Sequence, residues 1–139
     1  MSSYIPWNDI RTILLGSNVI DPSLVAFPNE IFQNPEPPAM WVSVEATSNM
    51  LDPIELVGGV WQEEGTAYFN IMVPAGFGTD DARKLAKDIS NLYRSLPPER
   101  PVIYRGGSIG NAVMADTEGM WWMITVSVDY IYDDMTTHT

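Results

Sequence analysis

Three segments of this sequence alternate an apolar with a more polar set of side chains, and this alternation constrains the fold more than any other feature. They run from about 40 to 47, from 60 to 73 and from 120 to 132. Successive side chains of an extended strand point to opposite faces, so a period of two is typical of strands with one buried face. We expect a bulge near Glu64-Gly65 in the second strand. The last strand is the longest, and we expect it near the centre of a sheet.

Apolar residues in two other segments recur at the three- and four-residue spacing of an amphipathic helix. The first helix is predicted from Trp7 to about Leu15, with Gly16 at its end. The second follows Thr79, a suitable N-cap, and stops before the Pro97-Pro98 pair. Its apolar face, which is expected to pack on the sheet, comprises Ala82, Leu85, Ala86, Ile89, Leu92, Tyr93 and Leu96.

Prolines punctuate the segment from 22 to 38, which is therefore expected to be an extended connector holding at most a short strand at 24 to 27. Between 102 and 115 we expect one or two further strands, broken by Gly106-Gly107 and followed by a turn at 116 to 119. The links of the second half are as short as those of hairpins. We therefore predict an α+β fold with a mostly antiparallel sheet of about four to five strands and two helices, the longer one packed on one face.

One domain is expected to span all 139 residues, with a flexible tail from about 134. The chain has 18 acidic and 7 basic side chains and a formal net charge of −11. Such a surface repels a phosphate backbone, so we expect no sequence-independent binding of nucleic acid. Neither a signal peptide nor an apolar run of roughly 20 residues occurs. The chain is therefore expected to be soluble, without a membrane role, and to stay where it is made.

The sequence offers no residues for a catalytic, cofactor-binding or metal-binding site. Cysteine is absent, and the single histidine, His138, lies in a terminal segment for which nothing predicts order. Three pairs of adjacent carboxylates occur, and none requires a catalytic explanation. The first pair points to opposite faces of a strand, the second complements the dipole at the start of a helix, and the third lies at a terminus that is expected to fray. We expect all of them to be solvated: Glu63-Glu64, Asp80-Asp81 and Asp133-Asp134. The chain is not expected to be an enzyme or to bind a cofactor.

Six of the seven cationic side chains fall between positions 83 and 105. They are Arg83, Lys84, Lys87, Arg94, Arg100 and Arg105. One interpretation is a solvated helix face on which Lys84 and Asp88 pair at the i, i+4 spacing. The other is charge complementarity between subunits. The sequence favours the first.

Trp41, Trp121 and Met123 fall on the strand face opposite to the one that receives the second helix. A sheet with large apolar groups on both faces has helices on both sides or a partner over one side. If the first helix covers these residues, they belong to the core. If it does not, Trp41 and Trp121 are candidates for an interface with another protein.

The order of these elements resembles the tail terminator family of long-tailed bacteriophages, and the resemblance covers nearly the whole chain. Its most specific part is the Val-Pro-Ala-Gly-x-Gly-Thr passage at 73 to 79. This passage leads into a helix with the pattern Ala-x-x-Leu-Ala-x-x-Ile from 82 to 89, and a late strand with two adjacent tryptophans follows at 119 to 126. The family pattern carries no catalytic positions, so none is transferred to this chain.

The resemblance implies a structural virion protein that forms a homo-oligomeric ring, commonly a hexamer, at the head-proximal end of the tail. The ring stops polymerisation of the tail tube protein and offers a surface to a head-completion or neck protein. DNA passes through it without specific binding, which suits an acidic chain. Assembly is expected in the host cytoplasm. Each subunit of a closed ring presents two different patches to its neighbours.

A long loop is expected from about 48 to 60 between two paired strands, and it holds apolar residues that a monomer has little reason to expose. With the tryptophan that follows, these are Leu51, Ile54, Leu56, Val57 and Trp61. One interpretation assigns them to an interface with the tail tube or a neighbouring subunit. The other folds the loop back over its own sheet.

Two other functions stay open at this point. A head-closure or neck connector protein shares ring assembly with a terminator and differs in its neighbours. A small ligand-binding domain or an enzyme of unrecognised type belongs to a different class, but the sequence offers it no site.

Overall fold

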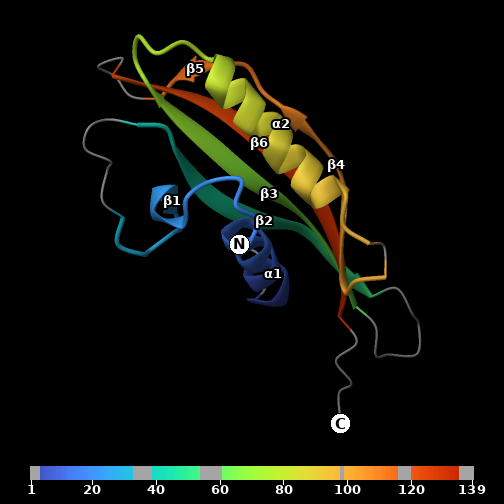
Figure 1. Ribbon diagram of the computed structural model, residues 1–139. Coiled ribbons are helices and arrows are strands. Elements are labelled where there is room, and N and C mark those ends of the chain that lie inside the picture. Colours follow the sequence, from blue (N-terminus) through green and yellow to red (C-terminus); the bar gives the residue numbers. More distant parts are fainter. Residues whose placement is uncertain (1–3, 33–38, 54–60, 98, 116–119, 135–139) are drawn as a thin grey trace.

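A computed structural model describes residues 4–32, 39–53, 61–97, 99–115 and 120–134 (Figure 1). The first helix begins before its predicted start at Trp7, and the second ends before the predicted Leu96. In chain order the elements are α1 (Tyr4–Leu15), a 3-10 turn (Pro22–Leu24), β1 (Val25–Ala26), β2 (Trp41–Pro53), β3 (Trp61–Pro74), α2 (Asp80–Arg94), β4 (Val102–Ile109), β5 (Val113–Met114) and β6 (Trp121–Asp134).

The strands form one sheet in the order β1-β2-β3-β6-β4, and β5 pairs with β6 beyond the end of β4. Every pairing is antiparallel except that of β1 with β2. The predicted α+β class and the mostly antiparallel sheet are confirmed. The sheet has six strands instead of four or five, because the two-residue strands β1 and β5 join the four long ones.

Both helices pack on the same face of the sheet, so the protein has two layers (Figure 1). α2 runs over β6 and β4, and α1 lies in front of β2. Ile10 and Leu14 of α1 are fully buried in the same core as Tyr93 of α2. The Tyr93 hydroxyl donates a 2.7 Å hydrogen bond to the Ile10 carbonyl. The structure therefore excludes the interpretation in which the first helix covers the opposite face.

A second group of polar contacts holds α1 to the segment that follows α2. Asp9 accepts hydrogen bonds from the Arg100 guanidinium at 2.7 Å and from the Tyr104 hydroxyl at 2.6 Å. The rings of Tyr104 and Tyr93 meet edge to face with their centroids 4.9 Å apart. Burial raises the pKa of both phenols, and the Asp9 carboxylate adds to the shift. Both hydroxyls therefore stay protonated and act as donors.

β2 contains a bulge between Ser48 and Met50, where its pairing with β3 shifts from Gly65 to Glu64. The bulge predicted near Glu64-Gly65 is therefore present, but its extra residue belongs to the partner strand. β2 then continues to Pro53, which corrects the prediction of a loop that starts at 48. The ladder with β3 outweighs the turn-forming tendency of the Asp-Pro dipeptide at the end of this strand.

β4 has a bulge at the same level of the sheet. Its pairing with β6 shifts between Tyr104, which lies opposite Tyr130, and Gly107. Tyr130 in turn lies opposite Gly65, so the two bulges align along one row that crosses the four long strands. At Gly107 the two backbones come so close that an added Cβ would stand 1.6 Å from the Ser127 carbonyl oxygen.

Replacing Gly107 by alanine is expected to lower the free energy of unfolding by about 1–3 kcal/mol, because the new methyl group forces β4 away from β6. Urea unfolding followed by circular dichroism measures the change. Gly106→Ala is the matched control, because a Cβ at Gly106 meets nothing within 4 Å. Equal losses in the two variants would contradict the close approach of the strands at Gly107.

Replacing Tyr93 by phenylalanine keeps the buried ring and removes the hydrogen bond to the Ile10 carbonyl. A lost buried hydrogen bond lowers the free energy of unfolding by about 0.5–1.5 kcal/mol. Tyr4→Phe removes the same hydroxyl from a side chain that is 74% exposed, so it should change nothing measurable. If Tyr93→Phe is as stable as the parent in thermal and urea unfolding, this bond does not hold α1 in place.

Candidate functional site

The sheet face away from the helices carries an apolar cluster at one end. Trp41 in β2 lies opposite Met72 in β3, which lies opposite Met123 in β6. The Trp41 ring packs against the Trp121 ring with centroids 6.1 Å apart. It also packs against the Phe32 ring with centroids 4.7 Å apart. All five side chains stay partly exposed. They are called the Trp cluster below.

The Trp cluster contains a buried donor without an acceptor. The indole Nε1 of Trp41 is shielded from solvent and makes no hydrogen bond within the described part of the chain. An unpaired buried donor costs about 1–3 kcal/mol. Closed protein cores rarely keep such a group, and this atom is also out of reach of an acceptor at the surface.

Beyond the Trp cluster the same face is polar and acidic. The Asn70 side chain accepts a 2.7 Å hydrogen bond from Thr125 and donates one of 3.1 Å to Glu45. Thr66 donates a 2.9 Å hydrogen bond to Asp129. Neutral donors therefore orient both carboxylates, which stay exposed. The face thus changes from apolar at one end to acidic along the rest.

The predicted interface residues divide between the two ends of the sheet. Trp41 and Trp121 meet in the Trp cluster. Leu51 lies near the end of β2, and Trp61 begins β3 opposite Pro53. Trp41 and Pro53 are twelve residues apart along β2, which corresponds to about 40 Å of strand. The remaining predicted residues fall outside the described residues: Ile54, Leu56 and Val57. The end near Pro53 and Trp61 is called the loop end below.

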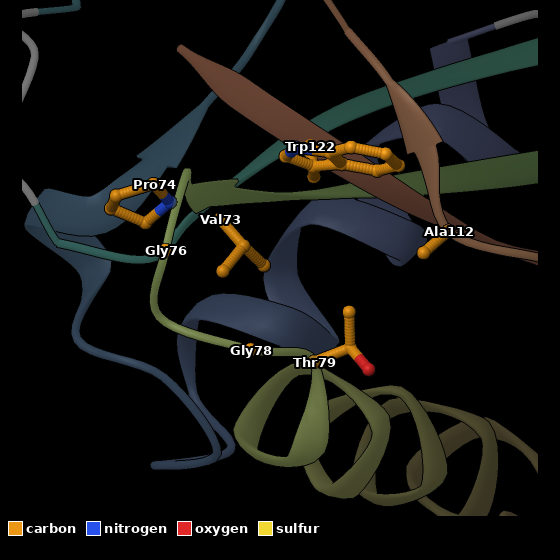
Figure 2. Close-up of a pocket in the computed structure, with 7 residues that line it drawn as sticks. All are labelled: Val73, Pro74, Gly76, Gly78, Thr79, Ala112 and Trp122. Carbon is orange, nitrogen blue, oxygen red and sulfur yellow. The ribbon is translucent and has the colours of Figure 1, made fainter. Parts of the chain in front are cut away.

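A hollow on the helix side of the Trp-cluster end escapes prediction from the sequence. It has a volume of about 280 Å³ and lies between the turn into α2 and the start of β6 (Figure 2). Its lining comprises Val73, Pro74, Gly76, Gly78, Thr79, Ala112 and Trp122. Trp122 is 40% exposed and the nearby Phe77 is 71% exposed. The sequence feature that could have indicated this hollow is the Trp121-Trp122 pair. Adjacent residues of a strand point to opposite faces, so one of the two rings lies on the helix side.

The turn that forms this hollow also starts α2. Gly76 and Gly78 adopt positive φ angles of 89° and 73°, a conformation that glycine reaches without a steric penalty. Thr79 occupies the N-cap position as predicted, but its side chain makes no capping hydrogen bond. Its hydroxyl accepts a hydrogen bond from the Arg83 guanidinium instead, at 3.2 Å. The turn therefore owes its shape to glycine backbone freedom and not to a side-chain cap.

Glu63 corrects the prediction that the Glu63-Glu64 pair is solvated. The exposed fraction of Glu63 is 3%, and its Oε2 accepts a 2.6 Å hydrogen bond from the Tyr130 hydroxyl. Glu64 lies on the opposite face of β3 and is partly exposed. The two carboxylates therefore do not converge, and they form no acid/base pair.

The described residues hold no group of three or more metal-ligating side chains. Within the same ranges, no helix is long and apolar enough to cross a membrane. What this geometry offers is contact surface: the Trp cluster, the hollow beside it and the acidic face.

Comparison with known proteins identifies one family that this chain matches. A family model described as phage tail terminator protein matches residues 14–130. A solved structure with 18% sequence identity superposes with a TM-score of 0.55, and the match covers 98% of this chain and 99% of the other. At this identity the likeness shows the fold alone. No curated protein matches the sequence.

Proposed function

The chain belongs to the phage tail terminator protein family, and from this premise we propose that it forms the ring that caps the tail tube. The family match spans most of the chain, so the protein is a structural component of a phage tail and of the virion. The finer role is the proposal: six copies close at the head-proximal end, stop tube polymerisation and join the tube to the head.

The separation of the two sheet ends carries this proposal. The Trp cluster and the loop end are about 40 Å apart along β2. A subunit that sits between a tube and a head needs one contact surface at each end of its long axis. The Trp cluster offers partly exposed aromatic rings, and aromatic residues are enriched in interfaces. The sequence between Pro53 and Trp61 contains the apolar residues Leu56 and Val57.

The charge of the chain fits a channel through which DNA slides. The net charge of −11 repels phosphate groups, so a ring of such subunits does not retain the DNA that passes. No base-reading element is required for this role.

Capping is tested by adding the purified protein to polymerising tail tube protein and imaging the products by negative-stain electron microscopy. We expect tubes of limited length, each with a ring at one end. A neck or head-closure protein would instead bind purified heads and leave tube length unchanged. That result would replace the terminator role with the neck role.

The two-ended subunit is tested with two separate variants. Trp41→Ser with Trp121→Ser removes two of the three aromatic rings of the Trp cluster, and Leu56→Asp with Val57→Asp introduces charge between Pro53 and Trp61. We expect each variant to lose one of two activities, capping or head joining, and to retain the other. Capping assays and head–tail joining assays measure the two activities separately.

Tyr4→Ser is the control for these variants, because it removes an exposed aromatic ring that belongs to neither surface. Circular dichroism checks that each variant keeps its fold. If both variants lose the same activity, the two ends do not serve different partners.

A further inference from the structure

We propose that neighbouring copies are joined through charge: the outward side of α2 in one copy lies against the acidic outer face of the sheet in the next. The inference rests on the proposed ring and assigns its copy-to-copy interface. The partner is a second copy of this chain.

The first half of this interface is a basic stripe on α2. Arg83, Lys87 and Arg94 are exposed, and their spacing of four and seven residues places them along one side of the helix. Lys84 is exposed beside them. The hydrogen bonds of Arg83 and Arg94 go to the neutral side chains of Thr79 and Asn91.

These cations lack a carboxylate partner within the part of the chain that the structure describes. The ion pairs found there are Arg11 with Glu30 and Arg100 with Asp9. The pair expected between Lys84 and Asp88 does not form. A solvated stripe and an interface are the two interpretations that the sequence leaves open. Exposed cations are stable in water without an ion pair, so the missing internal partner leaves these charges available to a second copy.

The second half is the acidic face of the sheet. Glu45 and Asp129 are exposed, and both accept hydrogen bonds from neutral side chains. Glu64 and Asp133 are partly exposed on the same face, and Asp133 accepts a 3.1 Å hydrogen bond from Gln62. In the described ranges none of these carboxylates forms an ion pair. Arg105 lines a hollow together with Glu64 and Asp129 but, within those ranges, pairs with neither, so the four carboxylates of this face outnumber its cation.

The two halves match in length. Arg83 and Arg94 are eleven residues apart on α2, which corresponds to about 16 Å. The row that holds Glu45 and the row that holds Asp133 are six residues apart along β6, which corresponds to about 20 Å. Cations spaced along a helix can therefore meet carboxylates spaced along the strands over the same distance.

The two halves also lie on opposite sides of the molecule. α2 covers the helix side of the sheet, and the carboxylates lie on the other side (Figure 1). A contact between them joins unlike patches, so each copy can bind one neighbour on each side, as a closed ring requires. Without such pairing, copies that each carry a charge of −11 repel one another.

Two charge-reversal variants test the interface. Variant A carries Arg83→Glu and Lys87→Glu, and variant B carries Glu45→Lys and Asp129→Lys. At the substituted positions variant A sets negative against negative charge and variant B sets positive against positive charge, so neither should form rings by itself. A loss of at least about tenfold in ring occupancy of tube ends is expected for each. Electron microscopy of capped tubes counts the rings against the unaltered protein.

Mixing A with B restores opposite charges at the substituted positions. The glutamates on α2 of A meet the lysines on the sheet of B, and the unaltered α2 of B meets the unaltered sheet of A. We therefore expect rings from an equimolar mixture of A and B, and from one chain that carries all four substitutions. Glu99→Lys, an exposed reversal outside both surfaces, should cap tubes normally. Each readout is compared with the unaltered protein in the same preparation.

The outcomes separate this inference from the proposed function. If the unaltered protein caps no tubes, the terminator role itself fails. If the unaltered protein caps tubes and variants A and B cap them equally well, the charge-matched interface is wrong. If A fails to cap and the mixture does not restore capping, the α2 stripe binds the tube and not a second copy, which also overturns the inference.

Discussion

Burial of apolar side chains from both helices in one core places the helices on the same face of the sheet, and the Tyr93 hydroxyl joins them by its hydrogen bond to the Ile10 carbonyl. Tyr93 and Ile10 are both buried in the core. The Asp9 contacts with Arg100 and Tyr104 reinforce the same arrangement from the side. Because one layer takes both helices, the opposite face of the sheet is left for contacts with other molecules, and a tail component acts through such contacts.

Much of this fold follows from periodicity alone. The alternation in the three long strands and the apolar face of α2 predict the α+β class, because each pattern matches one type of buried surface. The side of the sheet that α1 covers could not be predicted, since an amphipathic helix fits either face of a sheet that is apolar on both. The continuation of β2 through Pro53 could not be predicted from the sequence either, because pairing with β3 overrides the local preference for a turn. The burial of Glu63 depends on the distant Tyr130 hydroxyl, which no local pattern indicates.

The candidate site was predictable in its parts and not in its arrangement. The alternation of side chains along the strands places Trp41 and Trp121 on one face, and the structure brings their rings together. The sequence assigns Leu51 and Trp61 to a separate loop interface, and the long paired strands place them at the other end of the sheet. The hollow beside Trp122 depends on how the turn at Gly76 and Gly78 folds back, which only the assembled sheet defines.

The two aligned bulges bend the sheet along one row of residues. A bulge bends its strand and increases the local twist, and here one lies in β2 and one in β4, on either side of the Gly65 and Tyr130 row. The Trp cluster lies on one side of this row and the loop end on the other. One extra residue in each of two strands is thus a local change that alters the direction in which the two ends of the sheet point.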